Sequence, residues 1–256
     1  MVSLGAKGWV SLPFDPELKR WAERANHYAE SAMSDPALAQ WWVCENTWFV
    51  GVDALNNDSV GTLPDGTALP KALARDLSNS FGVYPFHKAQ VSVATPGYPK
   101  PRVGESEAGF RYRLNRAAAH VDGVKPEGPE RRRMIKEPHA YVLGLPLNDA
   151  PPEAAPLVVW QGSHEIMRRA INDALSPHPT ETWGDVDITD IYQAARREVF
   201  ETCPRVPIHA RPGEGYLMHR LSLHGVAPWQ GPDHGDRRIA YFRPAMTSAQ
   251  DWIEQS

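Results

Sequence analysis

Cysteine and long hydrophobic runs are the two things this sequence has least of. Cys44 and Cys203 are the only cysteines among 256 residues, and they do not form a Cys-x-x-Cys pair. Two such residues exclude a disulfide framework and a cysteine-based zinc or redox motif. No run approaches the roughly 18 apolar residues of a membrane-spanning helix, and the first residues lack the layout of a signal peptide. We therefore expect a cytoplasmic protein without a membrane partner.

A strong charge of one sign is lacking as well. The chain has 27 Lys and Arg against 31 Asp and Glu, which gives a formal net charge of −4. The one dense basic run, Arg131–Arg133, is three residues long and is typical of a solvated loop. Proteins that bind nucleic acid carry a basic face. The composition therefore predicts no nucleic-acid partner, and it gives no indication of oligomeric state.

Proline, by contrast, is abundant, with 24 residues, about twice the usual share. The prolines divide the chain into short elements. Asp15-Pro16 is typical of a helix start, Asp35-Pro36 predicts a second helix, and residues 68–80 predict a third. Alternating segments then predict strands; they are 47–55, 89–95, 110–121, 139–147, 157–160, 215–220, 222–227 and 237–243. Residues 163–202 return to a helical pattern.

This order of elements predicts a mainly β protein with flanking helices, a jelly-roll or cupin-like barrel. The length and the 42% of hydrophobic residues fit a single domain over residues 1–256. Within it we expect an N-terminal helical and strand elaboration at 1–84. The barrel core should occupy 85–245, with a helical insertion at 163–205.

Two His-x-Asp spacings stand out as candidate metal ligands. His234-Gly-Asp236 lies in a loop rich in glycine, proline and aspartate, which is typical of a solvated turn. His120-Val-Asp122 ends a predicted strand, where residues two apart share a face, and Gly123 lets the chain turn away. A surface pair at the end of a strand is the competing interpretation.

A third ligand comes from the segment that contains His219 and His224. Because the two histidines are five residues apart, an unbroken strand would place them on opposite faces. His224 precedes Gly225 and leaves room for one hairpin before Arg237, so it is the preferred ligand. His219 is then a packed histidine or a partner of a ligand. Two imidazoles and one carboxylate form the facial triad that holds non-heme Fe(II) and leaves three positions open.

The last predicted strand carries three arginines. Arg237 and Arg243 share one of its faces, and Arg238 lies on the other. A buried arginine needs an anion, and a guanidinium fork suits a carboxylate. We expect Arg237 to contact a dicarboxylate co-substrate with help from Arg243, with Arg238 in reserve. The alternative is that all three lie on an exposed sheet face.

With these residues, the sequence resembles the Fe(II)/2-oxoglutarate-dependent oxygenases, and among them the phytanoyl-CoA dioxygenase-like branch. Three segments carry the resemblance: 120–123 with the His-x-Asp-Gly pattern, 156–165, and 213–225 followed by Arg237. The middle segment is similar to the branch's Pro-Gly-Ser-His turn, with Gln161 where proline is usual. The resemblance covers residues 85–245 and does not identify a substrate.

The resemblance implies a double-stranded β-helix in which His120, Asp122 and His224 bind Fe(II). Arg237 would bind the distal carboxylate of 2-oxoglutarate. It implies a dioxygenase that uses O2, hydroxylates a small molecule and releases succinate and CO2. Two alternatives stay open: a cupin-type metalloenzyme that does not use 2-oxoglutarate, and a catalytically silent binding module. Arg237 argues against the first, and an intact triad against the second.

Overall fold

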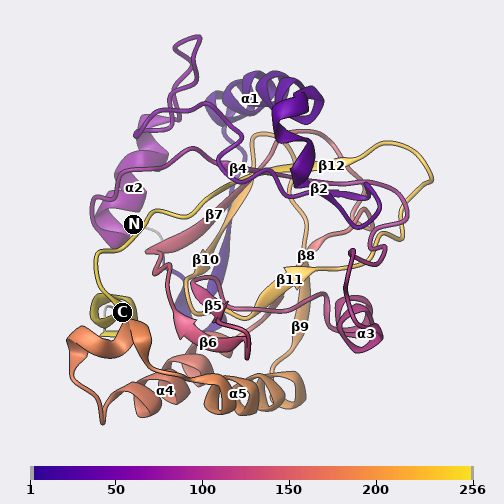
Figure 1. Ribbon diagram of the computed structural model, residues 1–256. Coiled ribbons are helices and arrows are strands. Elements are labelled where there is room, and N and C mark those ends of the chain that lie inside the picture. Colours follow the sequence, from indigo (N-terminus) through magenta and orange to yellow (C-terminus); the bar gives the residue numbers. More distant parts are fainter. Residues whose placement is uncertain (1–2, 255–256) are drawn as a thin grey trace.

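The computed structural model describes residues 3–254, and three antiparallel sheets form its centre (Figure 1). The strands are β1 Trp9–Leu12, β2 Trp42–Val43, β3 Trp48–Phe49, β4 Gln90–Ala94, β5 Val124–Glu127, β6 Arg132–Ile135, β7 Tyr141–Pro146, β8 Leu157–Trp160, β9 Arg205–Ile208, β10 Gly215–His219, β11 His224–Val226 and β12 Arg237–Phe242. The helices are α1 Pro16–Ser34, α2 Lys71–Phe81, α3 Glu107–Arg116, α4 Ser163–Leu175, α5 Thr189–Thr202 and α6 Ala249–Glu254, with short 3₁₀ turns η1 Gly5–Lys7, η2 Pro36–Trp41 and η3 Thr180–Asp185.

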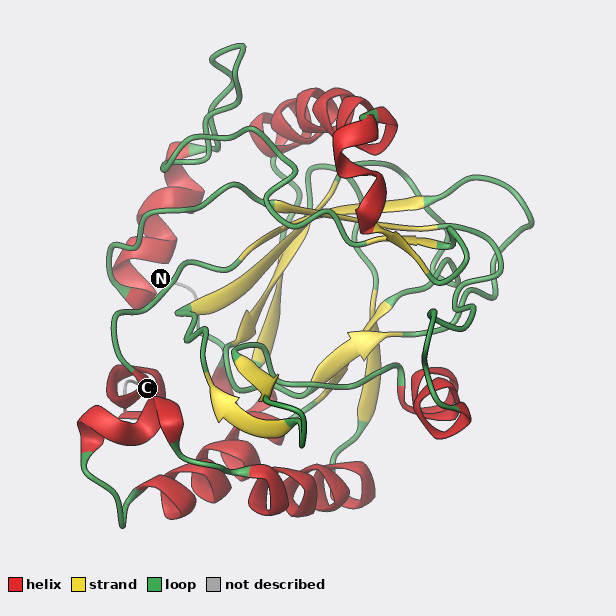
Figure 2. Cartoon of the chain, in the orientation of Figure 1, coloured by secondary structure: helices red, strands yellow, loops and turns green. Residues whose placement is uncertain are grey.

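The largest sheet has seven strands in the order β1-β10-β7-β12-β4-β3-β2. A smaller sheet has the order β11-β8-β9, and β5 pairs with β6 as a hairpin. In Figure 2, α1 covers one side of the large sheet, while α4 and α5 lie below the hairpin on the opposite side of the molecule. The first predicted segment, 1–84, contributes β1, β2 and β3, so it completes both edges of the large sheet.

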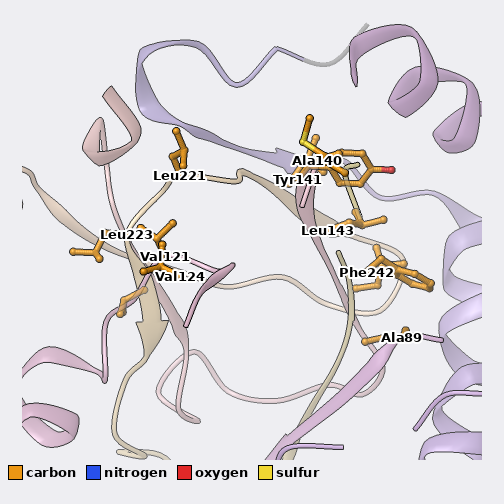
Figure 3. Packing of buried hydrophobic residues seen from close by; sticks show 14 of the residues in the cluster. Ala89, Val121, Val124, Ala140, Tyr141, Leu143, Leu221, Leu223 and Phe242 are labelled. Carbon is orange, nitrogen blue, oxygen red and sulfur yellow. The ribbon is translucent and has the colours of Figure 1, made fainter. Parts of the chain in front are cut away.

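The two faces of β12 have different surroundings, as period-2 alternation requires. Ile239 and Tyr241 belong to a buried cluster with residues of β7, β8, β9 and β10, which lies between the large and the small sheet. Phe242 packs outward against Trp21 of α1, with ring centres 5.8 Å apart. Figure 3 shows Phe242 with Ala89 and Leu143, across the fold from Val121 and Leu223 in the same large cluster. The sheet is therefore buried on both faces.

Several predicted elements are confirmed. Asp15 caps α1 by accepting hydrogen bonds from the backbone N–H groups of Glu17 and Leu18. The strand at 157–160 has the predicted bounds, and the helical insertion is present as α4, η3 and α5. In β12, Arg237 and Arg238 point to opposite faces, as predicted.

The strand predicted at 110–121 is wrong, because residues 107–116 form α3. Ser106 caps this helix by accepting from the N–H of Gly109, and the left-handed backbone of Ala117 ends it. This local capping decides the structure in favour of a helix. Tyr112 therefore does not lie on a strand face with His120. The strand predicted at 47–55 shortens to Trp48–Phe49, and β1, β2, β5, β6 and β9 were not predicted.

The described helices include none that is both long enough and apolar enough to span a membrane.

Trp21 should be a main source of stability, since its side chain is fully buried and its indole N–H donates to the carbonyl of Gly61. We expect Trp21→Ala to lower the free energy of unfolding by about 3–5 kcal/mol, because the substitution leaves a cavity and an unpaired carbonyl. Urea denaturation measures the change. Val83→Ala is the control, because Val83 is 85% exposed and its truncation should change little; equal effects would contradict the packing assigned to Trp21.

Candidate metal centre

The structure brings His120, Asp122 and His224 together, although about 100 residues separate the last two in sequence. The Nε2 atom of His120 lies 3.3 Å from Asp122 Oδ1, and Nε2 of His224 lies 3.5 Å from Asp122 Oδ2. One donor atom from each of the three residues lies within 4.8 Å of the other two. Among the described residues, this is the one group of three or more such side chains with the spacing of a metal site.

The backbone fixes the two histidines against each other. His120 and His224 form an isolated antiparallel bridge, with N–H···O distances of 2.9 and 3.1 Å. His120 is thus held by this bridge after α3 rather than by the predicted strand. The Nδ1 atom of His120 lies 3.0 Å from the carbonyl of Ala118, and that of His224 lies 2.9 Å from the carbonyl of Ser222. Because a carbonyl only accepts, each Nδ1 carries the proton and each Nε2 keeps a lone pair for a metal.

Gly225 permits this approach of the two segments. A Cβ atom at position 225 would lie 2.1 Å from the carbonyl oxygen of Ala117. Any side chain would therefore push His224 away from the 117–122 segment. The glycine that follows His224 in sequence thus has a structural cause.

Asp122 is charged despite its burial. It is 7% exposed, and Nη1 of Arg243 lies 3.3 Å from its Oδ2. Burial alone would raise the pKa of Asp122, but Arg243 and His224 outweigh it and hold the pKa well below the usual value. The carboxylate is therefore available as an anionic ligand at any physiological pH.

The three candidate ligands line a cavity of about 930 Å³. Its walls are mixed and include apolar residues such as Trp41, Trp48 and Val50 as well as the polar side chains of Arg243 and His139. Burial lowers the pKa of His139 to about 4, so this side chain is neutral at physiological pH. The cavity is large enough for a medium-sized organic molecule.

Arg237 is buried inside the fold without an anionic partner. It is 7% exposed, and its Nε and Nη2 atoms have no hydrogen-bond partner among the described residues. It lines a small second cavity with Tyr216. The hydroxyl of Tyr216 lies 2.9 Å from that of Tyr241, which lines the large cavity. The tyrosine pair therefore connects the wall of the small cavity, which Arg237 lines, with the wall of the large cavity.

Arg238 and Arg243 have partners of their own. Arg238 lies on the opposite face of β12 from Arg237 and pairs with Asp236 and with Glu30 of α1 at 2.8 and 2.6 Å. Arg243 contacts Asp122, a contact that the sequence did not predict because it forms beyond the end of β12. Only Arg237 remains as an unpaired cation in the interior face of this strand.

His219 lies apart from the candidate ligands. Its Nδ1 accepts from the backbone N–H of Leu221, and its ring stacks near His164 with centres 4.8 Å apart. Burial lowers the pKa of His219 to about 2 and also lowers that of His164. Both are neutral buried histidines under β1 and α4, and neither faces Asp122.

Comparison with known proteins finds no matching family model and no matching curated protein. Solved structures do match. The non-heme alpha ketoglutarate dependent carbocyclase SnoK from nogalamycin biosynthesis superposes with a TM-score of 0.52 at 14% identity, covering 97% of this chain and 85% of SnoK. EctD from S. alaskensis with bound Fe gives 0.51 at 18% identity, covering 94% and 73%. The structure of EctD with 2-oxoglutarate and 5-hydroxyectoine gives 0.50 at 17%, covering 96% and 74%. The chain shares the fold of these proteins.

Removing one candidate ligand should strongly weaken metal binding. We expect His224→Ala and Asp122→Ala to bind Fe(II) at least about 100-fold more weakly than the unmodified protein, because each loses a direct ligand. His219→Asn should bind it normally. Anaerobic equilibrium dialysis of the purified variants measures the affinities, and metal loss in His219→Asn with retention in His224→Ala would overturn the ligand set.

The buried histidines should make stability depend on pH. Because the folded-state pKa of His219 lies below the unfolded value near 6.5, only the unfolded state takes up this proton as the pH falls. The free energy of unfolding should therefore drop below pH ~6.5 by up to about 1.4 kcal/mol per pH unit for this group. His219→Asn, whose side-chain oxygen can still accept from Leu221, should show a flatter decline in urea denaturation between pH 7 and 5. Parallel curves would contradict a neutral, buried His219.

Proposed function

We propose that this protein is an Fe(II)- and 2-oxoglutarate-dependent oxygenase of the phytanoyl-CoA dioxygenase-like type that acts on a small molecule. The observation that carries the proposal is the convergence of His120, Asp122 and His224 at one end of a cavity. Two neutral imidazoles and one carboxylate suit non-heme Fe(II) and leave three coordination positions open. The donor set therefore fits the metal.

A jelly-roll barrel is part of the proposal. An antiparallel seven-stranded sheet and a three-stranded sheet enclose a shared apolar cluster, with His224 on the small sheet. This two-sheet arrangement is what a double-stranded β-helix requires. The fold shared with SnoK and EctD supports the same architecture.

Arg237 supports the use of 2-oxoglutarate. A buried guanidinium without an anion is strongly unfavourable, so its retention in an apolar interior indicates a site for an anionic ligand. The planar fork accepts a carboxylate in two parallel hydrogen bonds. A dicarboxylate can contact the metal with one end and Arg237 with the other, passing the Tyr216–Tyr241 pair. EctD, whose fold is similar, was solved with 2-oxoglutarate bound.

The residues of this chain have separate tasks in such a site. His120 and His224 offer their Nε2 lone pairs, and Asp122 offers one carboxylate oxygen while Arg243 holds the other. The apolar walls around Trp41 and Trp48 exclude water and hold the substrate. When bound, iron, 2-oxoglutarate and O2 supply the oxidising chemistry and release succinate and CO2.

Hydroxylation is the outcome that we propose. SnoK is an alpha ketoglutarate dependent carbocyclase, so a ring-forming reaction also occurs in a protein of this fold. The volume of the large cavity, about 930 Å³, lies at the upper end of the range for small-molecule sites. It favours a substrate of drug-like size over a molecule with only a few atoms.

Anaerobic titration tests the proposal directly. Fe(II) followed by 2-oxoglutarate should produce a weak visible charge-transfer band, and admission of O2 should release succinate. A screen of metabolites for increased succinate release then identifies the substrate. Tight metal binding without any response to 2-oxoglutarate would instead favour a cupin-type metalloenzyme, and no metal binding at all would favour a silent binding module.

Arginine variants should separate the three candidates on β12 and just beyond it. Arg237→Ala should raise the 2-oxoglutarate requirement for succinate formation by more than about tenfold, because a buried carboxylate loses its partner. Arg238→Ala should leave it unchanged, since Arg238 pairs with Glu30 outside the barrel. Arg243→Ala should fall between and should also weaken Fe(II) binding, because Arg243 contacts Asp122. A larger effect of Arg238→Ala than of Arg237→Ala would contradict the assignment.

A further inference from the structure

Four arginines from four separate elements gather on the outer side of the 117–124 segment, which carries two of the candidate ligands. They are Arg116 at the end of α3, Arg133 on β6, Arg196 on α5 and Arg205 at the start of β9. In Figure 1, α3, α5, β6 and β9 all lie in the lower half of the molecule. We call these four residues the arginine cluster.

Aromatic rings hold the arginine cluster in place. The Cζ atoms of Arg116 and Arg196 lie 4.7 and 5.9 Å from the centre of the Phe200 ring. Arg205 lies over Trp160 at 5.9 Å, and the Trp160 ring lies 5.2 Å from that of Phe200. The guanidinium groups of Arg116, Arg196 and Arg205 are thus stacked on a shared aromatic base, which fixes their positions without neutralising their charge, whereas Arg133 has no such ring contact among the described residues.

No carboxylate neutralises the cluster within residues 3–254. None of its four arginines has an Asp or Glu oxygen within the 4.0 Å that defines an ion pair. The Nε atom of Arg196 is buried and has no hydrogen-bond partner. Neighbouring arginines behave differently: Arg132 pairs with Glu130 at 2.5 Å, and Arg169 pairs with Glu198 at 2.9 Å. The four arginines of the cluster therefore keep their charge without an acidic partner in the described part of the chain.

The charges of the cluster also oppose one another. Burial and the nearby charges of Arg196 and Arg131 lower the pKa of Arg133. Burial and the charge of Arg116 lower that of Arg205. Like charges that are partly desolvated and not compensated reduce stability. An arrangement of this kind is favourable once an anion occupies the space between the groups.

We propose that the arginine cluster is a binding site for a phosphate-type oxyanion, separate from the candidate metal centre. Several neighbouring guanidinium forks from different elements suit an anion with three or four oxygens and a charge near −2 better than a flat monocarboxylate. The source is either free phosphate or the phosphate ester of a small molecule.

The site is connected to the metal-binding segment by two tyrosines. Tyr112 donates its hydroxyl hydrogen to the carbonyl of Ala119 at 2.7 Å, and Tyr192 accepts from the N–H of Val121 at 3.0 Å. The guanidinium of Arg196 lies over both rings, at 4.6 and 5.4 Å. An anion bound by Arg196 therefore lies next to the two tyrosines that hydrogen-bond to Ala119 and Val121, the residues on either side of His120.

Calorimetric titration of metal-free full-length protein with inorganic phosphate, at constant ionic strength, tests the proposal. We expect saturable binding that Arg133→Gln and Arg196→Gln each weaken by about tenfold or more, the loss of one charge-assisted contact. Arg169→Gln is the matched control, because Arg169 is an exposed arginine with an acidic partner, and it should bind phosphate normally. Sulfate should compete, and acetate should not.

Arg237→Ala serves as a second control, because buried Arg237 is the other unpaired cation described above. It should leave phosphate binding intact. Loss of binding in Arg237→Ala but not in the cluster variants would overturn the proposal, as would an absence of saturable binding or equal competition by acetate. Because the protein is free of metal and 2-oxoglutarate, the result does not depend on the proposed oxygenase activity.

Thermal unfolding can be measured even if a variant folds poorly, so it provides a second test. Phosphate should raise the melting temperature of the unmodified protein and not that of Arg133→Gln. Without phosphate, Arg133→Gln should be at least as stable as the unmodified protein, because it removes a repulsive contact. A phosphate-dependent shift of the same size in both proteins would refute the site.

Tighter binding of phenyl phosphate than of inorganic phosphate would identify an ester as the natural ligand, and equal binding would identify free phosphate.

Discussion

The buried charge of Asp122 is the constraint that organises the site. A carboxylate in a nearly dry environment is stable only if donors or cations surround it. Here the guanidinium of Arg243 does so, and the imidazoles of His120 and His224 lie beside the carboxylate; these groups come from three different parts of the chain. The close contact of Gly225 with Ala117 and the bridge between His120 and His224 bring those parts within reach. Metal binding and folding of this region therefore depend on the same contacts.

Caps and apolar runs in the sequence predicted the elements that do not depend on contacts with distant parts of the chain. The Asp15-Pro16 start of α1 and the apolar strand at 157–160 need no distant partner to be recognised. The phase of β12 was also predictable, because alternation distinguishes Arg237 from Arg238 whatever the neighbouring strands are. In contrast, residues 110–116 contain spacings that suit either a strand or a helix, and the Ser106 cap decided for the helix. The short strands β1 and β9 exist only because they pair with distant β10 and β8.

The sequence predicted the candidate ligands, but the structure brings them together in a different way from the strand alternation used to predict them. Strand parity was the argument for pairing His120 with Asp122, yet His120 follows a helix and meets His224 through a backbone bridge. The choice of His224 over His219 rested on the adjacent glycine, and the structure gives that glycine a steric role. Neither the contact of Arg243 with Asp122 nor the arginine cluster was accessible from sequence, because both join residues from elements far apart along the chain.

The alternation of arginines along β12 has a consequence for the evolution of this chain. Arg237 faces the interior, Arg238 ties the strand to α1, and Arg243 reaches Asp122 just past the strand's end. A deletion or insertion of one residue within β12 would exchange the inner and outer sets at once. It would bury Arg238 away from Glu30, turn Arg237 outward and shift Arg243 from the carboxylate. Length changes in this strand should therefore be far less tolerated than single substitutions, and also less than length changes at the exposed residues 233–235 of the preceding loop.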